Sequence, residues 1–214
     1  ASKIALNTIA RTVIPELHSN QPFTTLLDQG ISLANQEIID FTSKNPESQG
    51  MGTTSVCALV KDDEIHLANV GDSRAYVVSN EEIRRVTKDH SYVQGLIDQG
   101  QITEEESREH PQKNVITKAL GQSASIDSDT MKLKLAPDEN LLLCCDGVIA
   151  HLTDDDIKNT IMNSSDPQTA CQKIVDLAND RGGTDNISLI ILSSEKTDSK
   201  KDSEVIEDEK TIIK

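Results

Sequence analysis

Apolar residues recur every three or four positions along the first part of the chain, which is the spacing of one face of an α-helix. Over residues 2–19 this pattern predicts a helix that Pro15 is expected to kink or end. A second, longer helix is predicted over residues 22–43. The apolar faces consist of Ile4, Ile9, Val13 and Leu17 in the first helix and of Phe23, Leu27, Ile31, Ala34, Ile38 and Phe41 in the second.

The middle of the chain changes to short apolar stretches separated by turn residues, which is typical of β-strands. Two hairpins are predicted, one from "TTSVCALV" and "EIHLANV" around "KDD", the other from "RAYVVS" and "EEIRRVT" around "SN". Residues 124–135 and 139–145 predict two more strands. The apolar run "NISLIIL" near the end predicts a buried strand.

Two further helices are predicted between the last strands. One covers residues 152–163, with Thr153 as its N-cap and acidic residues in its first turn. The other covers residues 166–181, with Asp166 as its cap and Pro167 at its first position. Helices, then antiparallel strands, then two helices and a strand indicate an α+β fold in which helices cover β-sheets.

Two segments differ from this core. Residues 90–121 are polar and charged, with two small helices predicted in "SYVQGLIDQG" and "TEEESREH", and inserts of this kind tend to carry function. Residues 194–214 are charged and poor in apolar residues, which predicts a disordered tail after a single domain of residues 1–193.

Composition narrows the classes of function. The formal charge of −15 disfavours binding to nucleic acid or to an anionic membrane. No apolar run is long enough for a membrane span, and the start lacks a signal peptide's apolar region. The four cysteines have no zinc-site spacing, so we expect reduced thiols in a cytoplasmic protein. Without apolar heptads or an aromatic patch, we expect a monomer.

Three aspartates stand at strand ends: Asp72 after "LANVG", Asp146 after "NLLLCC" and Asp185 before "NISLIIL". Like charges at such places are costly unless they are compensated, and Mg²⁺ or Mn²⁺ prefers oxygen ligands. An aspartate beside a glycine at a strand end is also an ordinary turn. Spacing alone leaves a metal site and turn chemistry equally open.

Six motifs, in this order, resemble the metal-dependent protein phosphatases of type 2C, above all the bacterial serine/threonine phosphatases. The resemblance covers roughly residues 1–193 and implies two antiparallel sheets flanked by helices in four layers, αββα, with a binuclear Mn²⁺ or Mg²⁺ centre. The motifs are "GMGTTSVCALV", "LANVGDSRAYVV", "VTKDHSYVQGLIDQGQIT", "ITKALG", "LLLCCDGV…LTDDDI" and "RGGTDNISLIIL".

The resemblance also implies roles for particular residues. Asp146 and Asp185 correspond to catalytic metal ligands, and Asp72 to a ligand of a third, weaker metal site that shares Asp146. Gly147 and Asn186 would lie beside these ligands, and residues 90–121 correspond to the family's mobile flap at the substrate groove. The implied reaction is attack of a metal-activated water on a phosphoserine or phosphothreonine of a protein. The expected counterpart is a bacterial serine/threonine kinase that adds these phosphates.

One departure from the family pattern concerns the start of the chain. The family's "DGMGG" motif, an acidic ligand in an "N-E-D"-like stretch and a phosphate-binding arginine normally precede the region that resembles Ala1 onward. We therefore expect a chain truncated at its N-terminus that binds metal poorly and is weak or inactive by itself. The alternative is a non-catalytic pseudophosphatase that binds a phosphoprotein or a kinase through the same groove.

Four other residues have plainer interpretations. His90 is expected to serve the structure or the flap rather than acid catalysis, and His110 to be exposed. Arg74 is expected to pair with a nearby acid. Thr211, in the acidic end of the tail, is a candidate phosphothreonine for a recognition domain, although a solubilising tail is the simpler interpretation.

Overall fold

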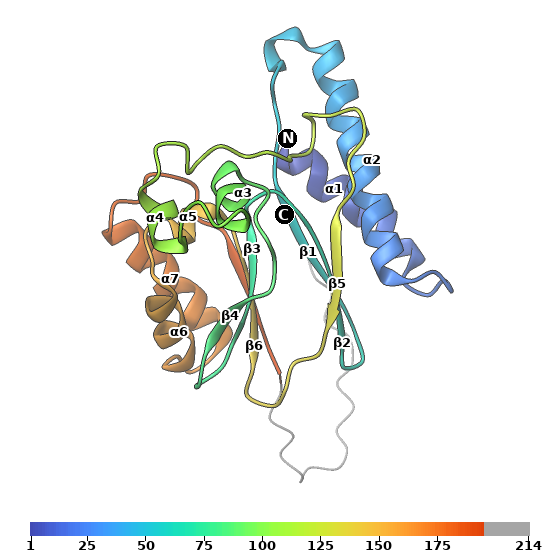
Figure 1. Ribbon diagram of the computed structural model, residues 1–214. Coiled ribbons are helices and arrows are strands. Elements are labelled where there is room, and N and C mark those ends of the chain that lie inside the picture. Colours follow the sequence, from blue (N-terminus) through green and yellow to red (C-terminus); the bar gives the residue numbers. More distant parts are fainter. Residues whose placement is uncertain (195–214) are drawn as a thin grey trace.

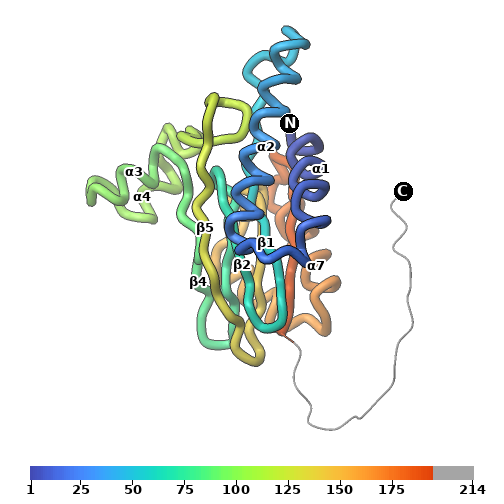
Figure 2. The backbone as a smooth tube through the Cα atoms, turned by 90° about the vertical axis from the view of Figure 1, so that its right-hand side faces the viewer, coloured from blue at the N-terminus to red at the C-terminus, as the bar shows by residue number. Residues whose placement is uncertain are grey.

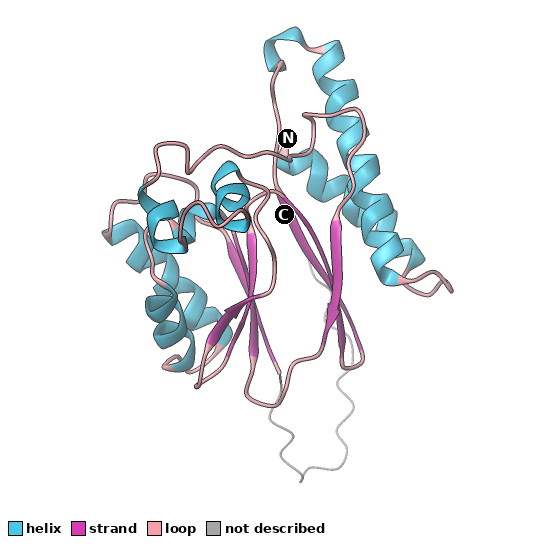
Figure 3. Cartoon of the chain, in the orientation of Figure 1, coloured by secondary structure: helices cyan, strands magenta, loops and turns pink. Residues whose placement is uncertain are grey.

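The computed structural model describes residues 1–194 as two β-sheets packed face to face and covered by helices on both outer sides (Figures 1 and 3). One outer layer consists of α1 (Ser2–Val13) and α2 (Phe23–Lys44). The predicted first helix ends early, because Pro15 falls in a short 3₁₀ turn, η1 (Ile14–Glu16), that closes it. A second 3₁₀ turn, η2 (Pro46–Ser48), follows α2.

The first sheet has the antiparallel strand order β1-β2-β5. Its strands are β1 (Ser55–Lys61), β2 (Glu64–Val70) and β5 (Asp129–Leu133). Ala68 and Val70 of β2 face α2, where they pack with Ile31, Ala34 and Ile38 in an aliphatic core. The alternate β2 residues Ile65 and Leu67 point to the other sheet, so one strand supplies two cores because successive side chains point to opposite faces.

The second sheet has the antiparallel order β4-β3-β6-β7. Its strands are β3 (Arg74–Val78), β4 (Ile83–Arg85), β6 (Asn140–Cys144) and β7 (Leu189–Ser193). The outer face is covered by α5 (Asp146–Ile149), α6 (Asp154–Met162) and α7 (Pro167–Asp180), and Ile157 and Ile174 are completely buried there. The four-layer αββα arrangement is the predicted fold class.

The prediction of a buried last strand is wrong. β7 lies at the edge of its sheet among the described residues and pairs with β6. None of its residues is fully buried, and Ile190 is 65% exposed. An apolar run does not reveal whether a strand is central or at an edge, since its composition is the same in both positions.

Residues 90–121 extend from one end of the sandwich and contain two small helices, as predicted. They carry α3 (Tyr92–Asp98) and α4 (Glu104–Glu109), which project to one side of the sheets in Figure 2. Ser91 caps α3, and Thr103 and Glu106 form a capping box on α4. We call residues 90–121 the flap. Its two ends meet at the bridge between Ser91 and Ile116.

Three further expectations concern the cysteines, membrane spans and the C-terminal tail. All four cysteines are free thiols. Each helix within residues 1–194 is too short or too polar to cross a bilayer. The predicted tail, 194–214 with Thr211, lies outside the described residues except for Ser194, whose hydroxyl donates to the backbone oxygens of Ala136 and Glu139.

Candidate active site

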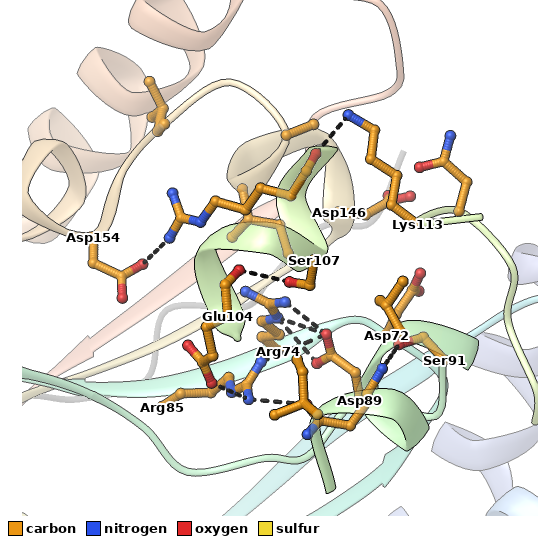
Figure 4. A pocket seen from close by; sticks show the side chains of 18 of the residues that line it. Asp72, Arg74, Arg85, Asp89, Ser91, Glu104, Ser107, Lys113, Asp146 and Asp154 are labelled. Carbon is orange, nitrogen blue, oxygen red and sulfur yellow. Dashed lines mark hydrogen bonds and ion pairs between the residues drawn. The ribbon is translucent and has the colours of Figure 1, made fainter. Parts of the chain in front are cut away.

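A pocket of about 270 Å³ opens between the flap and the segment that joins α5 to α6. Asp72 and Asp146 line it together with residues of α3, α4 and α6 (Figure 4). Strand register explains how these two aspartates meet. Arg74 of β3 pairs with Cys144 of β6, so Asp72, two residues before Arg74, and Asp146, two residues after Cys144, leave the same end of the sheet.

The proximity of the two carboxylates is visible in the electrostatics. Burial, followed by the negative charges of Asp146 and Asp89, raises the pKa of Asp72 to about 6, against the opposing effect of Arg74. Asp146 is exposed at the start of α5, and its carboxylate has no hydrogen bond or ion pair with residues 1–194. Negative charge therefore accumulates at this end of the pocket.

Asp185 lies on the loop before β7, beside this pocket rather than among its lining residues. Its carboxylate accepts a hydrogen bond from the backbone N–H of Asn186 at 2.7 Å. The loop reaches the pocket through Gly147, since a Cβ atom built on Gly147 would lie 2.3 Å from the backbone oxygen of Asn186. The predicted neighbours Gly147 and Asn186 are thus in direct backbone contact.

A loop histidine and arginine hold the segment before Asp185. His151 Nε2 accepts the N–H of Thr184 at 3.3 Å and lies 3.0 Å from its hydroxyl. Arg181 binds both carboxylate oxygens of Asp156, at 2.5 and 2.8 Å, and donates to the backbone oxygen of His151 at 3.2 Å. The "RGGTDN" segment is therefore attached to the start of α6.

The pocket floor contains a buried ion pair. Arg74 donates from Nε and Nη2 to Asp89 at 3.0 and 2.6 Å, and from Nη1 to the Tyr76 hydroxyl at 3.0 Å. Asp89 has 7% of its side chain exposed and also lies 3.6 Å from Arg85 Nη1. The expected pairing of Arg74 with an acid is confirmed. Sequence reasoning missed Asp89, because a partner 15 positions from Arg74 leaves no local pattern. It also missed Arg85, which lies only four positions before Asp89 but outside any helix that would bring the two together.

The flap supplies cations to the pocket. Arg108 Nη2 lies 4.0 Å from Asp154 of α6, and Lys113 Nζ donates to the backbone oxygen of Arg108 at 3.1 Å. Arg85 of β4 reaches α4 through Glu104 at 3.1 Å, so two ion pairs connect α4 with the core. His110, expected to be exposed, is only partly so and stacks obliquely on Tyr92.

The donors at the acidic end fit part of a hard-metal site. Carboxylate oxygens are the ligands that Mg²⁺ and Mn²⁺ favour, and the uncompensated charge at Asp72 and Asp146 is what a dication would neutralise. Within residues 1–194, no three His, Cys, Asp or Glu side chains are grouped closely enough to hold a metal ion. The described residues therefore bring two carboxylates together at this end of the pocket, with Asp185 on the loop before β7.

Comparison with known proteins decides the family. Residues 2–94 and 112–187 match protein phosphatase 2C. The chain belongs to the protein phosphatase 2C family. The unmatched residues 95–111 fall within the flap.

Individual relatives agree with this assignment. The chain is 32% identical over 178 residues to a serine/threonine phosphatase stp of Listeria monocytogenes, covering 83% of this chain and 71% of that protein. A crystal structure of a bacterial serine phosphatase superposes with a TM-score of 0.84 at 34% identity, covering 92% of this chain and 81% of that one. The catalytic domain of the serine/threonine phosphatase PstP, solved with two manganese ions, has a TM-score of 0.77 at 26% identity and covers 89% and 77%.

Proposed function

We propose that this phosphatase removes phosphate from phosphoserine and phosphothreonine in proteins, at the end of the pocket where Asp72 and Asp146 meet. The observation that supports this most is the pairing of an uncompensated carboxylate cluster with flap cations around one pocket. The carboxylates suit divalent cations, and Arg108 and Lys113 suit the anionic substrate. An acidic chain can thereby accept a phosphoprotein.

We propose Asp146, Asp185 and Asp72 as the residues of this chain that hold Mn²⁺ or Mg²⁺. Two ions are expected, with a third, weaker site that involves Asp72 and shares Asp146. When bound, such ions lower the pKa of a water molecule and neutralise charge on the phosphoryl oxygens. The chain's own contribution is to aim the carboxylates: the register of β3 and β6 places Asp72 beside Asp146, and Gly147 admits the loop that carries Asp185.

The flap residues attract and orient the substrate in this proposal. Arg108 is exposed and its pair with Asp154 is long, so a phosphoryl group can replace Asp154 as its partner. Lys113 adds a second positive charge at the same rim. A serine/threonine kinase that produces the substrates is the expected counterpart, and the protein is expected to act as a cytoplasmic monomer.

The carboxylates within residues 1–194 favour weak activity for this chain, because no three possible ligands among them are grouped closely enough to hold a dication well. The same observation is what a second candidate function rests on: a non-catalytic phosphatase fold that binds phosphoproteins or a kinase through this pocket. Both candidate functions require the pocket to bind a phosphoprotein, but only the phosphatase releases phosphate from it.

The test is phosphate release from a phosphothreonine peptide, with and without Mn²⁺. It is run on this chain and on a version extended by whatever residues its gene encodes upstream. Mn²⁺-dependent release by the extended protein, lost in Asp146→Asn, supports the enzyme. Tight binding of the peptide without release by either protein would replace the enzyme with the binding function.

A further inference from the structure

His90 lies at the base of the flap and forms two hydrogen bonds with Gly71, the residue that precedes Asp72. Its backbone N–H donates to the Gly71 oxygen at 2.9 Å, and the Gly71 N–H donates to His90 Nδ1 at 3.0 Å. Both polar backbone groups of Gly71 therefore bind one residue, 19 positions away along the chain. This double contact ties the turn that carries Asp72 to the base of the flap.

Gly71 cannot be replaced in this turn, which shows how closely the turn is enclosed. It has a φ of +106°, a conformation that favours glycine, and a Cβ atom there would lie 2.3 Å from Thr54 Cγ2. On one side the turn contacts Thr54, and on the other it is bonded to His90. Asn69, itself 1% exposed, adds a long contact from Nδ2 to the Gly71 oxygen at 3.4 Å.

The hydrogen bonds determine which nitrogen of His90 carries the proton. Because Nδ1 accepts from Gly71, the proton of a neutral ring is on Nε2. Nε2 lies 3.2 Å from Asp129 Oδ2, so the proton points at a carboxylate at the start of β5. Lys118 Nζ lies 3.6 Å from the other oxygen of Asp129, so each oxygen of this carboxylate has a partner. The ring is 13% exposed, so water competes little with these contacts.

The two ends of the flap meet at the same residue. Thr117, near the end of the flap, donates its N–H to the His90 oxygen at 2.8 Å. The adjacent bridge joins Ser91 to Ile116. His90 thus links three parts of the protein that are distant in sequence: the Gly71–Asp72 turn, the base of the flap and β5.

We propose that His90 is a positioning residue for Asp72: the Nε2–H tautomer, oriented by Asp129, holds the Gly71–Asp72 turn so that the Asp72 carboxylate faces Asp146. The role of Asp72 as a metal ligand rests on the proposed function. The tautomer of His90 and its hydrogen bonds to Gly71 do not depend on the proposed function. The proposal about His90 and the proposed metal site can therefore be tested separately. His90 acts through backbone contacts and does not touch substrate.

The first readout is nuclear magnetic resonance of the intact chain at pH 7.5 without metal. Long-range ¹H–¹⁵N spectra of His90 should show a protonated Nε2 and an unprotonated Nδ1. A protonated Nδ1 would overturn the proposal. Asp129→Asn should leave the fold intact and weaken this tautomer preference, because the neutral amide attracts the Nε2 proton less than a carboxylate does.

The second readout is amide hydrogen exchange of Gly71. His90→Leu should speed it at least about tenfold, because its acceptor is lost. His90→Asn, whose side-chain oxygen can take the place of Nδ1, should retain most of the protection. His110→Leu is the control, since it removes a flap histidine without touching Gly71. Unchanged Gly71 exchange in His90→Leu, with the fold verified by circular dichroism, would overturn the proposal.

The third readout is Mn²⁺ affinity by electron paramagnetic resonance. Removal of a residue that orients a metal ligand commonly costs about 10–100-fold in affinity. That loss of Mn²⁺ affinity is expected in His90→Leu. A smaller loss is expected in His90→Asn, and no loss is expected in the His110→Leu control. Faster Gly71 exchange with unchanged Mn²⁺ affinity would refute the positioning role. If the unaltered chain bound no Mn²⁺, the proposed metal site would fail, and Gly71 exchange alone would then decide whether His90 holds the turn.

Discussion

The backbone oxygen of Asn186 occupies the space in which a side chain on Gly147 would begin, 2.3 Å from the ideal Cβ position. This contact joins the start of α5, with Asp146, to the loop that carries Asp185. The segments that carry these two candidate ligands lie far apart in the chain, and they can touch here because Gly147 has no side chain. The contact with the Asn186 backbone therefore explains why position 147 is a glycine.

Gly147→Ala should accordingly destabilise the protein by about 1–3 kcal/mol, as overpacking against backbone does. Urea unfolding measures this. Gly95→Ala in α3 is the matched control: a Cβ there meets nothing within 4 Å, so the change should be neutral or stabilising by up to about 1 kcal/mol. Equal effects of the two substitutions would show that the Gly147 contact is not tight in solution.

Asp89 balances the charge of Arg74 and Arg85 beneath the pocket. Asp89→Ala should lower the free energy of unfolding by about 3–5 kcal/mol, because it leaves a buried guanidinium without its partner. Glu82→Ala removes the exposed ion pair with Arg84 and should cost about 0–1 kcal/mol. A small loss in Asp89→Ala would mean that water reaches Arg74 and screens it.

Asp166 predicts a pH dependence in α7. Its carboxylate accepts the Thr169 N–H at 2.8 Å and the Thr169 hydroxyl at 2.7 Å, and these bonds lower its pKa to about 2. Since the folded-state pKa lies below the ordinary value of 3.8, the stabilisation is complete above about pH 4 and is lost as the pH falls through 2. The stability difference between the protein and Asp166→Ala should be constant from pH 5 to 8 and shrink below pH 4. A difference independent of pH would exclude the charge of the cap as its cause.

Most helices and strands can be predicted from local patterns in the sequence, whereas the arrangement of the candidate active site cannot. Periodicity predicts α2 and β2 closely, and the capping residues Thr153 and Asp166 are found where the sequence places them. β7 was misjudged because edge position depends on pairing, which the sequence of one strand does not encode.

The approach of Asp72 to Asp146 depends on strand register, and spacing alone left a metal site no better supported than turns. Nothing in the sequence predicts the hydrogen bonds between His90 and Gly71, apart from the resemblance of "KDH" to the family pattern. Such contacts join residues that are far apart in the chain, so they appear only once the sheets are assembled.

The most direct test of the account is Mn²⁺ binding to this chain and to three variants, followed by electron paramagnetic resonance. Asp146→Asn and Asp72→Asn should each weaken binding by about tenfold or more, because each removes a charged oxygen ligand. Asp154→Asn, a charge-matched change in the same pocket, should have little effect. Equal weakening by all three would reduce the site to a diffuse acidic surface, and no weakening by Asp146→Asn would contradict the central claim.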